Sequence, residues 1–463
     1  MGGETLGLYD QSMPDTAHTA QTTAPVTLSQ AFWFWLKLGF ISFGGPAGQI
    51  AMMHEALVQR HRWISDKRFL HALNYCMLLP GPEAQQLATY IGWLMHKTWG
   101  GVIAGVLFVL PSLLMLIGLS WVYVAWGHLP VLAGLFMGIK PAVAALVLQA
   151  THRLGSKALK NPWMWGIAAG SFIAIFAFQM SFPLIVALAA GAGWLLGRWH
   201  PEAFQMKAGH ASVAASEGPA WIDDHSPTPA HARFNGPALV RVILVGLLLW
   251  SLPMWALWHG LGLDHAFTQM SWFFTKAAFL TFGGAYAVLP YVYQGAVEQF
   301  AWLTPLQMMD GLALGETTPG PLIMVVAFVG FVGAYAHAVL GPDHLFLAGA
   351  LAAGLVTWFT FLPSFIFILA GGPLVESTHS QLSYTAPLTA ITAAVVGVIL
   401  NLAVFFTSHL LWPLGWGGRF DLASAVMMVL AAWALMRLKI NVIWVIALSA
   451  LAGLGWQQLS LFT

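Results

Sequence analysis

The chain has 463 residues, 59% of them hydrophobic and 8% charged, with a net charge of +1 at pH 7. A soluble domain carries about 25% charged residues, so this chain cannot cover a water-facing surface with polar groups. The charge gives no sign of a nucleic-acid partner, and the single cysteine, Cys76, excludes an internal disulfide and a multi-cysteine metal cluster.

The first residues, 1–29, are polar and lack the basic region and cleavage site of a signal peptide, so we expect a disordered cytoplasmic tail. Apolar stretches of about 20 residues, the length that spans a bilayer, then recur. Helices are expected because lipid offers no hydrogen-bond partners, so the backbone N–H and C=O groups must bond to one another within the segment. The alternation of apolar and polar residues that is typical of a membrane β-barrel is absent. The chain is therefore predicted to be an all-α polytopic membrane protein, with spans that include Val102–Val124, Pro162–Met180, Pro237–Trp258 and Leu345–Ala370.

The two halves of the chain repeat one another. The segment Lys37–Gly45 is echoed 239 positions later by Lys276–Gly284. At the same spacing, Trp63-Ile64-Ser65 corresponds to Trp302-Leu303-Thr304, and Pro80-Gly81-Pro82 corresponds to Pro319-Gly320-Pro321. Leu110-Pro111-Ser112 returns as Leu362-Pro363-Ser364 at a spacing of 252. Coincident matches of this kind indicate an internal duplication.

The duplication divides the chain into a first repeat (30–197), a Pro/Ala/His/Asp-rich cytoplasmic linker (198–236), one unpaired helix (237–259) and a second repeat (266–463). One extra crossing between repeats with an even number of spans inverts the second copy. The loop Gln59–Arg68 has four basic residues and its partner Glu298–Gln307 has none, and basic loops face the cytoplasm. We therefore predict inverted repeats in the inner membrane.

Four segments of about 28 residues carry a Gly/Pro break in their middle, and we predict them to be re-entrant pairs of half-helices. This gives about nine full spans and four re-entrant segments, of up to 13 hydrophobic segments. Four full spans in place of the re-entrant pairs would keep the inversion but move the basic cluster Arg153–Lys160 outside.

The first break of each repeat contains a glycine pair, Gly44 and Gly45 in one half and Gly283 and Gly284 in the other. A break at membrane depth exposes the N–H groups and partial positive charge of a half-helix N-terminus, which suit an oxyanion. The alternative is that these glycines only permit a kink or close helix packing.

The second breaks carry Gly81 and Gly320, with uncharged donors beside them: Gln85, Gln86, Thr317 and Thr318. Such donors bind an oxyanion without losing a proton. Equally, they could satisfy the backbone carbonyls that the prolines leave free.

Charged residues at membrane depth are functional candidates by default. Lys37 and Lys276 are equivalent cations seven residues before their glycine pairs, although each could instead extend to an interface. Glu83 and Glu316 are candidates for coupling a proton to the anion, with Asp310 and Lys140 as weaker ones; Glu83 could instead only stabilise the start of its helix.

These paired motifs resemble the chromate ion transporter family in its long, two-domain form. The resemblance rests on Phe43-Gly44-Gly45-Pro46 with Phe282-Gly283-Gly284, on Pro80–Ala88 and on Thr318-Pro319-Gly320-Pro321. It implies chromate efflux across the inner membrane and chromate resistance, with sulfate handling in some members, and halves of opposite orientation.

We therefore predict a secondary transporter for chromate or a related oxyanion such as sulfate, driven by protons or a counter-anion and surrounded by membrane lipid. No cofactor, metal or nucleic acid is expected, and a homodimer is compatible with the sequence. The alternatives are a membrane-embedded enzyme acting on lipid-linked substrates and an anion channel. The sequence has no metalloprotease, nucleophile-elbow or phosphate-loop motif, which argues against catalysis.

Overall fold

The computed structural model describes residues 25–200, 220–223, 226, 229–282, 284–377, 385–413, 415 and 417–460. Gly283, most of the predicted N-terminal tail and much of the predicted linker lie outside these residues. Within them every element is helical apart from one isolated bridge between Ile64 and Ile222. Six helices are long and apolar enough to cross a membrane, and four more apolar helices are shorter. The chain is an all-α polytopic membrane protein, as predicted.

The first half begins with two short helices separated at Gly44, whose φ is +90°. The long helix α4 reverses at His96 and Lys97, where the backbone is not helical, so its two arms lie side by side and Gly92 faces Gly100. The elements in order are α1 (Leu28–Ile41), α2 (Gly45–His54), the π-helical turn η1 (Glu55–Arg60), α3 (Asp66–Cys76), α4 (Glu83–Trp126), α5 (Pro130–Ala158), α6 (Pro162–Phe178) and α7 (Phe182–Trp199).

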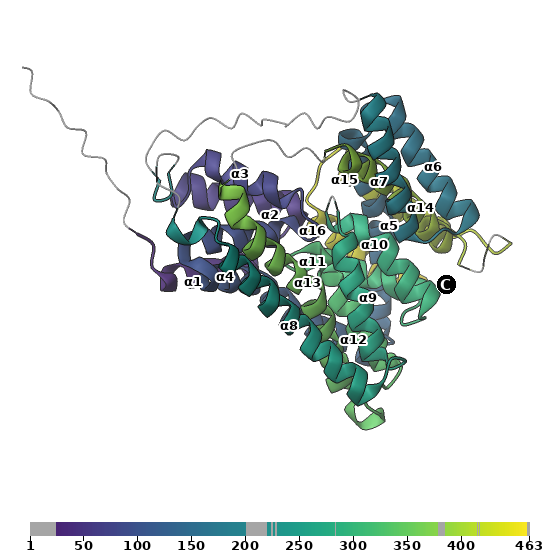
Figure 1. Ribbon diagram of the computed structural model, residues 1–463. Helices are drawn as coiled ribbons and strands as arrows, with labels where there is room; N and C mark the ends of the chain where they lie inside the picture. Colours follow the sequence, from purple (N-terminus) through teal and green to yellow (C-terminus); the bar gives the residue numbers. More distant parts are fainter. Residues whose placement is uncertain are drawn as a thin grey trace, which may run out of the picture.

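The second half follows a short 3-10 turn and one unpaired helix, α8, which runs diagonally across the front of the molecule (Figure 1). The remaining elements are η3 (Ala230–Ala232), α8 (Gly236–Leu261), α9 (Ala266–Leu280), α10 (Ala285–Tyr293), the π-helical turn η4 (Gln294–Gln299), α11 (Pro305–Thr317), η5 (Leu322–Met324), α12 (Val325–Ala336), η6 (Pro342–His344), α13 (Leu345–Ser377), α14 (Thr385–Leu411), α15 (Leu422–Met436) and α16 (Val442–Ser460).

The order of elements repeats in fine detail. The turns η1 and η4 begin 239 positions apart, and π-helical turns are rare. The same spacing separates the N-cap residues of α3 and α11, Ser65 and Thr304, whose hydroxyls accept hydrogen bonds from the N–H groups of Arg68 and Gln307. Because an unusual turn and its following cap recur together, the duplicated motifs correspond to duplicated structure.

The two halves are interlocked. Helix α5 packs against α15 and α16 of the second half, whereas α14 packs against α6 and α7 of the first. Small residues allow the helices to approach this closely. Gly138 packs against Ser449, Gly193 packs against Ala390, and Gly397 packs against Ala168. The largest buried apolar cluster draws residues from both halves, so neither half encloses its core alone.

Candidate functional site

The four helix breaks meet in crossed pairs. The N–H of Gly81 donates to the carbonyl of Thr281 at 2.7 Å, and the N–H of Gly320 donates to the carbonyl of Ser42 at 2.8 Å. Ser42 and Thr281 are equivalent residues of the first breaks, and Gly81 and Gly320 are equivalent residues of the second. The first break of each half therefore contacts the second break of the other, and we call these four residues the crossed junction.

The Leu-Pro-Ser motifs complete the crossed junction, again across the halves. A Cβ atom on Gly81 would collide with Oγ of Ser364, and one on Gly320 would lie 2.7 Å from Cβ of Ser112. The φ angles of Gly81 and Gly320 are +128° and +105°, which disfavour any other residue. The motifs had indicated duplication in the sequence, but their serines had not been identified as site residues.

Several buried polar atoms at the crossed junction have no partner among the described residues. Gln49 donates through Nε2 to the carbonyls of Ser42 and Gly320, at 3.2 and 2.5 Å, but its Oε1 is unpaired, as is Oγ of the fully buried Ser112. An unsatisfied buried polar group costs about 1–3 kcal/mol. Such groups therefore indicate a place for water or a polar ligand.

The uncharged donors of the second breaks are used on the protein's own backbone and side chains. Gln86 donates to the carbonyl of Pro80 at 2.8 Å and Gln85 to the hydroxyl of Thr89 at 3.0 Å. The hydroxyls of Thr317 and Thr318 donate to carbonyls of α11. Gln85 and Gln86 each keep a buried, unpaired Oε1. The alternative interpretation, in which such groups satisfy carbonyls freed near the prolines, therefore describes Gln86 and also Thr318, whose hydroxyl donates to the carbonyl of Gly315, four residues before Pro319.

The starts of α2 and α10 face open space. The φ angles of Gly44, Gly45 and Gly284 are +90°, +69° and +98°. A Cβ atom on Gly45 or Gly284 would find no atom within 4 Å, although Gly284 is buried. The first N–H groups of a helix have no partner inside it, so both helix starts leave room for an acceptor.

The two predicted lysines do not join these buried groups. Both Lys37 and Lys276 are exposed. Lys37 lines a separate cavity of about 280 Å³ with Glu55 and Arg60, and Nζ of Lys276 lies 6.0 Å from the ring of Trp272. Their exposure favours the alternative in which each extends to an interface.

The predicted acids have partners that the sequence did not reveal. Glu316 accepts a hydrogen bond from the hydroxyl of Tyr286, and Glu83 is the first residue of α4. Two exposed cations one turn apart on α5 interact electrostatically with these groups, Lys157 with Glu83 and Arg153 with Tyr286. Both cations lie on α5, whereas the sequence predicts them in a basic loop on the cytoplasmic side.

Two further charged clusters join the halves. In the α11 cluster, Asp310 accepts from the Tyr123 hydroxyl at 2.9 Å and lies 3.7 Å from Nζ of Lys140. This ion pair joins Lys140 of the first repeat to a carboxylate of the second.

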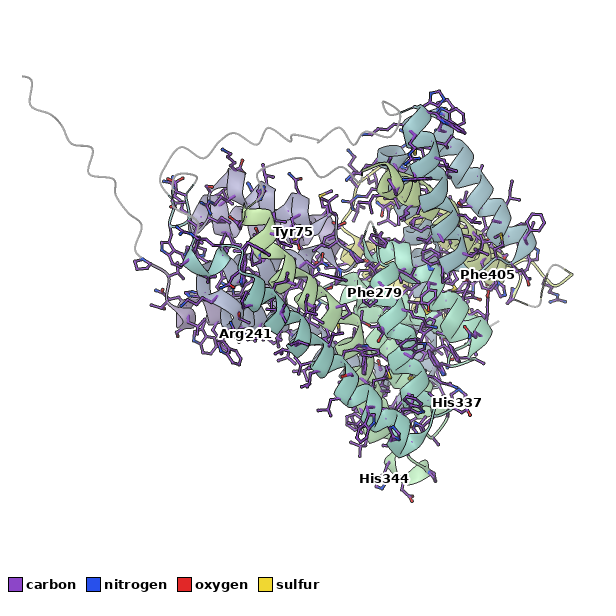
Figure 2. The ribbon with its side chains drawn as sticks, viewed as in Figure 1. Tyr75, Arg241, Phe279, His337, His344 and Phe405 are labelled. Atoms are coloured by element: carbon purple, nitrogen blue, oxygen red, sulfur yellow. The ribbon has the colours of Figure 1, made fainter. Side chains whose placement is uncertain are left out.

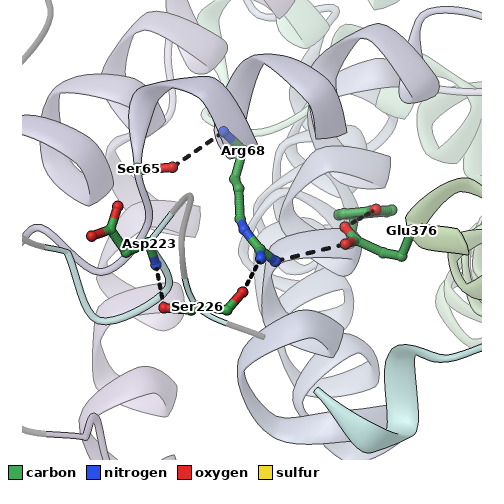
Figure 3. A network of polar contacts seen from close by, with 6 residues as sticks. Ser65, Arg68, Asp223, Ser226 and Glu376 are labelled. Atoms are coloured by element: carbon green, nitrogen blue, oxygen red, sulfur yellow. Dashed lines mark hydrogen bonds and ion pairs between the residues drawn. The ribbon is translucent and has the colours of Figure 1, made fainter. Parts of the chain in front are cut away.

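In the α13 cluster, Glu376 accepts from the Tyr90 hydroxyl at 2.6 Å and lies 3.7 Å from Arg68, which also donates to the carbonyl of Ser226 (Figure 3). Helix α3 is equivalent to α11, and the second arm of α4 is equivalent to α13. The two clusters therefore join equivalent pairs of helices, α3 with α13 and α11 with α4, although their charged residues differ in position, since Arg68 corresponds to Gln307 and Asp310 to His71.

Comparisons with known proteins agree with the resemblance in the motifs. The family model described as chromate transporter matches residues 29–194 and 268–454. A chromate transport protein of Pseudomonas aeruginosa is 31% identical over 453 residues, 96% of each chain, and one of Cupriavidus metallidurans is 28% identical over 395 residues, 85% of this chain and 86% of that one. The uncharacterized transporter YwrA of Bacillus subtilis is 32% identical over 171 residues, 36% of this chain but 94% of its own. No solved structure matches.

Proposed function

This chain belongs to the chromate transporter family, and from that premise we propose that it exports chromate, or a related oxyanion such as sulfate, across the inner membrane as a secondary active transporter. The family is one of transporters, which argues against the alternative of a lipid-modifying enzyme. The observation that carries the proposal is the crossed junction, where buried, unpaired polar atoms lie beside broken helices from both halves.

The oxyanion binds between the halves. Ser112 offers a free hydroxyl, and the open starts of α2 and α10, at Gly44, Gly45 and Gly284, offer backbone N–H groups. Side-chain amides present either an oxygen or an NH₂ group to a ligand, depending on a half-turn of the amide. Gln85 and Gln86 are proposed to supply donors when the anion is bound, by turning toward it the NH₂ groups that now donate to Thr89 and to the carbonyl of Pro80. A single shared site follows, because each break is completed by the opposite half.

The exposed basic pair Arg153 and Lys157, which lies within electrostatic range of Tyr286 and Glu83, is proposed to raise the local concentration of anions near this site. Glu83 and Glu316 are proposed to couple a proton to the anion. The role predicted for Lys37 and Lys276 stays a prediction, and exposed side chains such as theirs would act at the surface rather than on the bound anion.

We propose that the repeats, 30–197 and 266–463, are inverted around the linker and α8. Equivalent contacts then lie on opposite sides of the membrane, so the α11 cluster and the α13 cluster close opposite entrances. Both are formed in this structure, as expected of an occluded state. Opening them in turn gives alternating access to the crossed junction.

The function is tested with purified protein in liposomes and labelled chromate or sulfate. We expect uptake that saturates, that is accelerated by unlabelled chromate on the other side, and that responds to an imposed pH gradient. The better substrate is the one with the lower concentration at half-maximal rate. Flux that rises linearly with concentration and shows no acceleration from the other side would instead establish an anion channel.

A further inference from the structure

The helix α8 is held to the rest of the molecule mainly at its second half. Trp250 donates to the hydroxyl of Thr275 at 3.1 Å, Trp358 donates to the carbonyl of Leu249 at 3.2 Å, and Thr268 donates to that of Leu257 at 3.4 Å. Of the residues of α8, all of which the structure describes, only Gly246 is buried, against Ile366. Before Gly246, the residues of α8 are not buried against the rest of the molecule.

A cavity of about 630 Å³ lies between α8, α4 and α13. Most of its wall is apolar and includes Val102, Val106, Val245 and Phe365. Its charged lining consists of three cations, Lys97, Arg233 and Arg241. Figure 2 shows Arg241 at the end of α8 beside α1–α4. The cavity therefore combines a long apolar wall with positive charge.

The three cations have no carboxylate within ion-pair distance among the described residues. Lys97 stands at the reversal of α4 with a φ of +56°, a conformation that costs a non-glycine residue energy. It lies within electrostatic range of His231, and burial lowers the pKa of this histidine, so near pH 7 the imidazole adds no charge. The positive charge is therefore held by side chains that have no carboxylate partner in the part of the chain that the structure describes.

We propose that this cavity binds one anionic phospholipid, with its phosphate between Lys97, Arg233 and Arg241 and an acyl chain along α4 and α13. A gap that opens toward hydrocarbon is filled by lipid, because an empty one forfeits dispersion contacts. The unpaired cations select an anionic headgroup, as basic pockets between transmembrane helices do. The lipid thereby braces α8, the helix that connects the two halves.

The binding is tested by native mass spectrometry and thermal unfolding of the whole protein in detergent, with added phosphatidylglycerol or phosphatidylcholine. Phosphatidylglycerol should remain bound and raise the melting temperature, whereas phosphatidylcholine and inorganic phosphate should not. The double variant R233Q/R241Q should bind phosphatidylglycerol roughly ten- to thirtyfold more weakly, as expected from the loss of two cations at a membrane surface. A matched control, R437Q/K439Q, removes two exposed cations between α15 and α16 and should bind it like the native protein.

A third variant, V102W/V106W, fills the apolar wall and keeps the cations. It should also lose the lipid, which separates a lipid site from simple attraction of phosphate. Equal protection by both lipids, equal weakening in the control, or undiminished binding by V102W/V106W would each overturn the proposal.

Discussion

Replacing Gly81 or Gly320 by alanine should reduce chromate transport by roughly five- to 150-fold. Each glycine has a positive φ angle, and another residue there costs about 1–3 kcal/mol. In G81A the new Cβ atom would also displace Ser364, and the hydrogen bond from the N–H of residue 81 to the carbonyl of Thr281 would be lost. In G320A it would displace Ser112, and the hydrogen bond to the carbonyl of Ser42 would be lost. Initial rates in liposomes, normalised to the amount of folded protein, measure the effect.

The matched control is Gly118→Ala on α4, because a Cβ atom at Gly118 meets nothing within 4 Å. It should transport at the native rate. The two junction variants should fall by similar factors, since their contacts are equivalent. Native transport by either variant would show that the crossed junction is not needed.

Replacing Asp310 by asparagine should destabilise the protein by about 3 kcal/mol and reduce transport at least tenfold. Asp310 is 2% exposed, and its loss of charge leaves Lys140 without its partner; breaking one side of a buried ion pair costs about 3–5 kcal/mol. Denaturant unfolding in detergent and liposome transport measure the two effects separately.

The double variant K140M/D310N separates the two roles of this cluster. Removing both charges should recover most of the lost stability, because no uncompensated charge remains. Transport should stay low if the pair must close an entrance. Recovery of transport together with stability would make the α11 cluster a purely structural contact, and R68M/E376Q provides the same test for the α13 cluster.

The positions of the helix breaks could be predicted from the sequence because glycine and proline act locally. Gly44, Gly81, Gly284 and Gly320 all interrupt helices as expected. At the second break of the first half, Pro82 is the N-cap and Glu83 the first helical residue. The π-helical turns were not predicted, because a π turn depends on how the helix fits its neighbours.

The crossing of the breaks could not be predicted, because hydrogen bonds such as that from Gly81 to Thr281 join residues far apart in the chain. The lysines illustrate a different limit. Helix α1 buries Trp35 and Leu38, and Lys37 lies on its other face. The hydrophobicity of the segment predicts that Lys37 lies at membrane depth. Whether its side chain contacts lipid, water or a ligand depends on which face of the helix it occupies, and the sequence alone does not show this.

The most direct measurement is a structure of the protein in lipid nanodiscs, determined by electron cryomicroscopy with and without chromate. A single tetrahedral density should appear between the halves, about 3 Å from Oγ of Ser112, the distance of an ordinary hydrogen bond. Density beside Lys37 or Lys276, or two separate sites that each use one half alone, would contradict a shared site at the crossed junction.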